Sequence, residues 1–228
     1  MLALNMDKLG PSFAFSMVVS LVLIIVACDP SPTPLPACIS TTAGATGGGC
    51  IAFTSFRDHK QQIYVMNPDG SGQTNLTNSP PREETPSWSP DGVKIAFVSD
   101  RDDNSEIYVM DLSTGKQSRV TDNKFFDGSL SWSPDGQKLL FHSDRDEKGR
   151  DGNFEIYTMN PDGSEVQRLT RQTAKDLEPV WSTDGGAIYY VSWLDGDPDV
   201  FRMSPDGSQQ EFMTRSFAPD LSPEASPA

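Results

Sequence analysis

Carboxylate and amide side chains are the residues of this sequence most suited to metal chemistry. Four of them alternate as at the start of a calcium-binding loop: Asp100, Asp102, Asn104 and Glu106. A longer relative of this series contains Asp144, Asp146, Asp151, Asn153 and Glu155. No glutamate follows at the spacing of a bidentate ligand. We therefore favour capping of turns by these side chains, with a calcium site as the alternative.

Catalytic residues are not indicated. The histidines are His59 and His142, and neither has a cysteine or a second histidine at metal-ligand spacing. The sequence contains no Gly-x-Ser-x-Gly elbow and no phosphate-binding loop of the Walker type. Most aspartates belong to turn motifs, so no general acid and base stand out. We expect a protein that is not an enzyme and has no cofactor.

Arginine recurs at one position of the repeat, each time followed by an aspartate, at Arg57, Arg101 and Arg145. These arginines form either a ring of cations on a binding face or ion pairs with neighbouring carboxylates, and we favour the ion pairs. Trp193 and Phe217 break the pattern and are candidates for exposed binding contacts. Three other tryptophans keep the pattern and are expected to pack between strands: Trp88, Trp132 and Trp181.

Short apolar runs recur and predict the elements that carry these residues. One run begins at Ile51, Ile95, Leu139 and Ile188. A second begins at Ile63, Ile107, Ile156 and Val200. A period in the forties built from short apolar runs is typical of β-propeller blades.

Turn motifs divide each repeat into hairpins. Ser-Pro-Asp-Gly occurs at 89–92 and 133–136, and related turns occur at 67–70, 160–163 and 204–207. In the second repeat this predicts strands near 85–89, 94–99, 106–111 and 116–121. The fold class is therefore all-β, with four four-stranded antiparallel blades.

The motifs together resemble the WD40-like (PD40) repeats of the TolB family. They are Trp-Ser-Pro-Asp-Gly, Ile-Ala-Phe, Ser-Asp-Arg-Asp and Glu-Ile-Tyr-Val-Met, within residues 50–215. The resemblance implies a β-propeller and a periplasmic location. TolB's separate α/β domain has no counterpart in this sequence, and four repeats are present instead of six blades.

The first repeat begins at Ile51 without an inner strand. In the tail, 216–228, residues Pro219–Ala225 can be laid over Pro86–Gly92. We expect this segment to supply the missing strand and close a four-bladed ring. An open arc and a larger ring made by two chains are the alternatives.

Residues 1–27 are predicted to be a signal peptide. The apolar run Phe13–Ala27 is shorter than the roughly 20 residues of a spanning helix. It ends at Cys28 in a sequence that resembles a bacterial lipobox, which implies lipidation of Cys28. A plain secretory signal and an uncleaved anchor are the alternatives. Residues 28–49 are rich in Pro, Ser, Thr and Gly and predict a tether.

Cys38 and Cys50 remain as an even pair once Cys28 is lipidated. In an oxidising compartment they are candidates for a disulfide, with two free thiols as the alternative.

The formal net charge of −14 disfavours nucleic acid as a partner. We expect a bacterial envelope lipoprotein, held at the outer face of the cytoplasmic membrane or in the periplasm, that binds a protein or a glycan. One alternative is a polysaccharide lyase or hydrolase with carboxylates at the propeller channel. Another is the accessory propeller of a peptidase. Oligomers are compatible with each of these functions.

Overall fold

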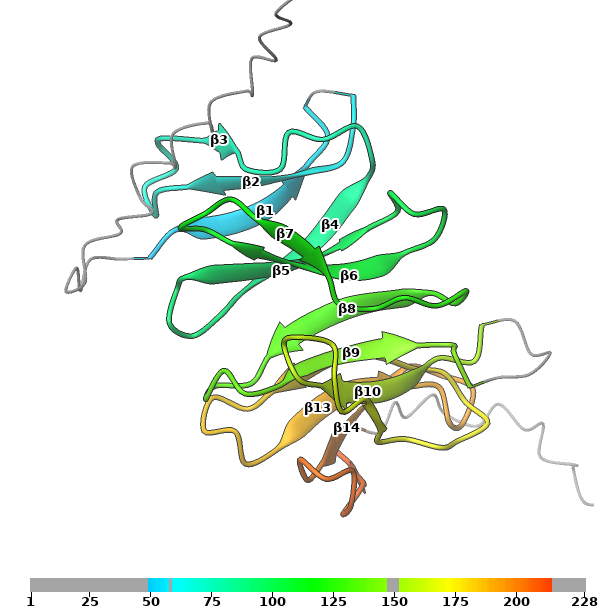
Figure 1. The fold of residues 1–228 in the computed structure, drawn as a ribbon. Coiled ribbons are helices and arrows are strands. Elements are labelled where there is room, and N and C mark those ends of the chain that lie inside the picture. Colours follow the sequence, from blue (N-terminus) through cyan, green and yellow to red (C-terminus); the bar gives the residue numbers. More distant parts are fainter. Residues whose placement is uncertain (1–48, 58, 147–151, 215–228) are drawn as a thin grey trace, which may run out of the picture. The chain divides into compact units, whose positions relative to one another are not determined.

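The computed structural model describes residues 49–57, 59–146 and 152–214, which form four antiparallel sheets (Figure 1). The first sheet contains β1 (Ile51–Ser55), β2 (Gln62–Met66) and β3 (Thr74–Asn75). The second contains β4 (Glu83–Trp88), β5 (Lys94–Ser99), β6 (Glu106–Asp111) and β7 (Gln117–Arg119). The third contains β8 (Asp127–Trp132), β9 (Leu139–Ser143), β10 (Glu155–Met159) and β11 (Gln167–Arg168). The fourth contains β12 (Asp176–Trp181), β13 (Ile188–Ser192), β14 (Asp199–Met203) and β15 (Glu211–Phe212).

Within each sheet, strands that follow one another along the chain are hydrogen-bonded neighbours. The Ser-Pro-Asp-Gly turns make the first reversal in the second and third sheets. In the second sheet the Gly92 N–H donates to the Ser89 carbonyl at 2.9 Å, and Gly92 has a φ of 70°. The Asp91 carboxylate accepts hydrogen bonds from the Ser89 hydroxyl at 2.6 Å and the Val93 N–H at 3.1 Å. The turn is therefore stabilised by its own side chains.

The inner strands β4, β8 and β12 each contain a bulge after their second residue. Thr85, Ser129 and Glu178 lie within these bulges and have a positive φ. The bulge lets a buried acid begin each strand while a tryptophan ends it. This repeated irregularity separates a polar end of each sheet from an apolar end.

The hydrophobic core lies between neighbouring sheets. Phe97 and Tyr108 of the second sheet pack on Ile63 and Val65 of the first. Corresponding clusters join the second sheet to the third and the third to the fourth. The middle strands of the second and third sheets are thus buried on both faces. Among the described strands, contacts join only neighbouring sheets, and none joins the fourth sheet to the first.

The predicted all-β fold of four repeated antiparallel sheets is confirmed, and the first sheet lacks an inner strand within the described residues. The outer strand expected at 116–121 is shorter and spans Gln117–Arg119, although the Val120 N–H still donates to the Ile107 carbonyl of β6 at 2.9 Å. Three predicted segments lie wholly or mostly outside the described residues: the signal peptide at 1–27, the tether at 28–49 and the tail at 216–228. Closure by the tail therefore stays a prediction. No described segment is a helix suited in length and hydropathy to crossing a membrane.

Candidate functional site

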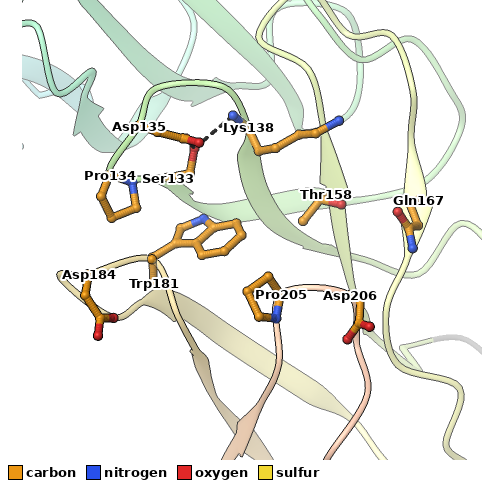
Figure 2. A pocket seen from close by; sticks show the side chains of 11 residues that line it. Ser133, Pro134, Asp135, Lys138, Thr158, Gln167, Trp181, Asp184, Pro205 and Asp206 are labelled. Atoms are coloured by element: carbon orange, nitrogen blue, oxygen red, sulfur yellow. Dashed lines mark hydrogen bonds between the residues drawn. The ribbon is translucent and has the colours of Figure 1, made fainter.

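A pocket of about 680 Å³ lies where turns of the third and fourth sheets meet (Figure 2). The β8–β9 turn supplies one wall, and the β12–β13 and β14–β15 turns supply the others. Trp181, at the end of β12, lies between Pro134 and Pro205. The pocket is lined by Ser133, Pro134, Asp135, Lys138, Thr158, Gln167, Trp181, Asp184, Gly185, Pro205 and Asp206.

Three turn carboxylates give this pocket its charge: Asp135, Asp184 and Asp206. Each uses one oxygen, Oδ1, to accept a 2.6 Å hydrogen bond from a serine hydroxyl of its own turn. These bonds hold the pKa of each carboxyl below its ordinary value. All three side chains are therefore ionised at neutral pH.

Lys138 is the cation that lines the pocket, and it is already engaged. Its Nζ donates to Asn160 Oδ1 at 2.8 Å and pairs with Glu165 Oε2 at 3.0 Å. Three carboxylates beside an indole and two proline rings suit a cationic side chain, because the charge and the aromatic face both attract it. Three turn-capping carboxylates with lowered pKa values do not make a general acid and base.

A smaller version of this pocket, of about 370 Å³, lies one repeat earlier. There Trp132 takes the place of Trp181 and donates its Nε1–H to the Ser87 carbonyl at 3.2 Å. The repeat spacing had identified the tryptophans as packing residues, which fits this contact. It had not identified the pocket, because the walls come from different repeats.

The recurring arginines lie over aromatic pairs and beside acids. Arg101 pairs with Glu83 and lies 4.2 Å from the centroid of the Tyr108 ring. Arg145 pairs with Asp127 at 2.7 Å. In the first sheet Arg57 lies 4.4 Å from the Tyr64 centroid and donates to Gln73 Oε1 at 2.7 Å. These contacts fit the favoured structural role, and Arg57 is the exposed member of the set.

A series of fully buried carboxylates begins the strands beside the arginines: Glu83, Glu106, Asp127, Glu155 and Asp176. Four of them pair with an arginine. The arginine of Glu83 and of Asp127 lies in the turn after the next strand, and that of Glu106 and of Glu155 lies on the outer strand alongside. Carboxylates paired in this way hold neighbouring segments of a sheet together.

The fourth sheet departs from this pattern at Asp176. Leu194 stands where the other sheets have arginine, and it is 48% exposed. Neither oxygen of Asp176 has a hydrogen bond of ordinary geometry. Burial raises the pKa of Asp176, although the hydroxyls of Ser192 and Thr170 are near enough to oppose that effect. Burial also raises the pKa of the Tyr190 hydroxyl, and the negative charges of Asp176 and Glu155 raise it further.

The calcium candidates point to different protein groups. Asp100 accepts from the Arg82 N–H at 2.8 Å, and Asp102 accepts from the Tyr108 hydroxyl. Asn104 directs its amide NH₂ toward Glu106 Oε1 at 2.9 Å. These contacts fit loop capping. Within the described ranges, no group of three or more His, Cys, Asp or Glu side chains is placed to hold a metal ion.

The histidines His142 and His59 lie in different environments, one buried and one exposed. His142 is buried and stacks on Phe126, with centroids 5.9 Å apart, and meets the edge of Phe154 at 5.1 Å. Burial lowers its pKa to about 4. His59 is exposed in the β1–β2 turn.

The remaining candidates fall at the periphery. Trp193 is 43% exposed in the turn after β13. Cys50 is disulfide-bonded, but its partner lies outside the described residues, so the pairing with Cys38 stays a prediction. Cys28 and Phe217 are also outside the described residues.

Repeated four-stranded antiparallel sheets, joined by Pro-Asp-Gly hairpins and packed face to face, define a β-propeller protein. The TolB beta propeller domain family, PD40, matches residues 38–150 and 147–228. The chain belongs to this family.

Individual relatives agree with the family. The Tol-Pal system protein TolB of Geobacter sulfurreducens is 46% identical over 43 residues, which are 19% of this chain and 10% of that protein. The crystal structure of TolB from Acinetobacter baumannii matches with a TM-score of 0.65 and 30% identity, covering 75% of this chain and 43% of that one. A structure assigned to TolB from Agrobacterium tumefaciens matches with a TM-score of 0.63 and 28% identity, covering 71% and 59%. The chain thus spans about half the length of these structures.

Proposed function

We propose that this protein is a non-catalytic scaffold of the bacterial cell envelope that binds a protein partner through the turn pocket of its third and fourth sheets. The single observation that carries the proposal is the set of three ionised carboxylates around Trp181. Such a pocket suits a lysine or arginine side chain of a basic protein surface. A glycan partner is an outcome of the test below.

The rigidity of the pocket supports a binding role. Its carboxylates are held by hydrogen bonds within tight turns, and its tryptophan ends a paired strand. A preorganised surface loses little entropy when a partner binds. Membership of the TolB propeller family supports the same role, because the Geobacter relative is named as a component of the Tol-Pal system.

We further propose export and anchoring through a lipid on Cys28. This rests on the apolar run before Cys28 and on the Pro-rich segment after it. Metabolic labelling with a palmitate analogue tests it: the wild type and Cys38→Ala should carry label in the membrane fraction, and Cys28→Ala should carry none. Equal labelling of Cys28→Ala would contradict the anchor.

The binding proposal is tested by removing charge without removing the turn caps. Asparagine keeps the Oδ1 acceptor, so Asp135→Asn/Asp184→Asn/Asp206→Asn should fold normally. Full-length wild type should retain an envelope protein on affinity purification and should bind an acetylated tri-lysine peptide, seen by a shift of the Trp181 indole signal in NMR. The triple variant should lose both signals.

Asp69→Asn/Asp111→Asn is the matched control. Both of these carboxylates cap turns in the same way and have lowered pKa values, but neither lines the pocket. Equal losses in control and pocket variants would contradict the site. Retention of a glycan in place of a protein, or release of product from envelope polysaccharide, would contradict the proposed function.

A further inference from the structure

One face of the fourth sheet carries apolar side chains that no other described strand covers. Val180 on this face is 50% exposed, and four neighbours are half-buried: Leu177, Tyr189, Val191 and Val200. The same face of the second sheet carries Ala96, Val98, Ile107 and Val109, which are 0 to 8% exposed because the third sheet packs on them. The fourth sheet therefore ends the series with an open packing surface.

This surface carries one ion pair beside its apolar side chains, because Arg202 and Glu211, 3.6 Å apart, stand where the second sheet has Val109 and Ser118. Val180 pairs with Tyr189, whereas serine occupies the position of Val180 in the covered inner strands, at Ser87 and Ser131. Met213 is 49% exposed, although Leu76, Val120 and Leu169 pack into cores at its position in the preceding sheets. An apolar patch of this kind marks an interaction surface.

The first sheet exposes the complementary face. Ile51 is 41% exposed, and Phe53 and Met66 are half-buried. Their counterparts Ile95, Phe97 and Met110 are buried against the preceding sheet. The first sheet also has the aromatic pair and arginine that the second and third sheets have. It is therefore built to receive a preceding sheet.

Where the outer turn has the sequence Pro-Asp-Gly, its glycine points to the same conclusion; the second sheet has a different turn there, at 111–115. A Cβ at Gly163 would overlap the carbonyl of Val120 in the preceding sheet, and one at Gly207 would lie 2.7 Å from the Leu169 carbonyl. Gly70 has the corresponding place in the first sheet and a similar φ of 82°, yet no atom lies within 4 Å of its Cβ position. The residue of the fourth sheet that corresponds to Val120 and Leu169 is Met213.

We propose that the open face of the fourth sheet binds the first sheet of a second copy of this chain. Within the described part of one chain the first and fourth sheets do not contact each other, which leaves both faces available to a second chain. The contact continues the interface already present between neighbouring sheets. In two copies placed head to tail, the fourth sheet of each copy packs on the first sheet of the other. The result is a ring of eight sheets, within the size range of propellers.

The test is the mass of the full chain in detergent, measured by size-exclusion chromatography with light scattering up to about 50 µM, a range in which standard interfaces associate. The wild type should be a dimer. Met213→Asp, on the fourth-sheet face, and Ile51→Asp, on the first-sheet face, should each weaken dimerisation at least tenfold. An equimolar mixture of the two variants should recover a dimer containing one of each, because one of its two interfaces is intact.

Val93→Asp is the matched control, since Val93 is 47% exposed in a turn that belongs to neither face. It should leave the dimer unchanged, and circular dichroism should show every variant folded. A monomeric wild type would overturn the proposal. A dimer that survives both face variants, or a mixture that stays monomeric, would overturn it too. A lower melting temperature of Met213→Asp at unchanged monomer mass would indicate closure within one chain instead.

Discussion

Asp127 and Asp176 begin the inner strands of consecutive sheets. Asp127 forms an ion pair with Arg145, whereas Arg168, the arginine near Asp176, pairs with Glu155. Burial raises the pKa of Asp127 as well, but Asp127→Asn leaves the Arg145 guanidinium without its carboxylate, so we expect a loss of about 2 to 3 kcal/mol in unfolding free energy. Asp176→Asn breaks no such ion pair. Because burial raises the pKa of Asp176, its ionised form costs stability above the ordinary pKa, and the amide removes that cost. Urea denaturation at pH 7 should place Asp176→Asn within about 1 kcal/mol of wild type or above it. A larger loss for Asp176→Asn than for Asp127→Asn would contradict this account.

His142 also acts at the scale of a single residue. Its pKa falls from 6.5 to about 4 on burial, so the folded state binds fewer protons than the unfolded chain between these values. Above pH 6.5 burial of His142 therefore costs no protonation free energy. As the pH falls below 6.5 the unfolding free energy decreases, by about 2 kcal/mol at pH 5. His142→Phe should lose correspondingly less stability between pH 7 and pH 5 in urea denaturation.

At the scale of the element, the space around the glycine of an outer hairpin turn shows whether a neighbouring sheet packs against that turn. Gly70 and Gly163 have φ values of 82° and 86°, so alanine is strained equally at both. A Cβ at Gly163 also meets the Val120 carbonyl, and a Cβ at Gly70 meets nothing. In the Met213→Asp background, which removes association, Gly70→Ala should cost about 1 kcal/mol and Gly163→Ala about 2 to 4 kcal/mol. Equal melting temperatures of the two variants would refute the close contact between sheets.

At the scale of the whole molecule, stability depends on position in the series of sheets. Phe53 and Phe141 both stack on a tyrosine under an arginine, with centroids 5.9 and 5.6 Å apart. Phe141 is fully buried between two sheets, and Phe53 is half-buried on the first. In the same Met213→Asp background, Phe141→Ala should cost about 3 to 5 kcal/mol and Phe53→Ala less than half of that. Chemical denaturation measures both, and a similar cost would mean that the first sheet is covered in the monomer.

The local sequence was enough to predict the repeat, the strands and the hairpins. A Pro-Asp-Gly turn and an Ile-Ala-Phe strand depend on neighbours within a few residues, and their recurrence shows that one unit has been copied. The same reasoning predicted the absence of an inner strand before Ile51. It also favoured structural roles for Arg101 and Arg145. Their partners Glu83 and Asp127 begin the inner strands β4 and β8.

The tertiary structure decided what depends on residues from different repeats. The pocket exists because turns of the third and fourth sheets converge on Trp181, and spacing along one repeat contains no information about that convergence. The isolation of Asp176 became visible only when burial was known, because an aspartate and a missing arginine are unremarkable in a sequence. The open face of the fourth sheet was likewise hidden, since Val191 and Val200 have the same apolar pattern as strands that are covered on both sides. Sequence determines which side chains a strand offers, and packing of whole sheets determines which of them remain without a neighbour.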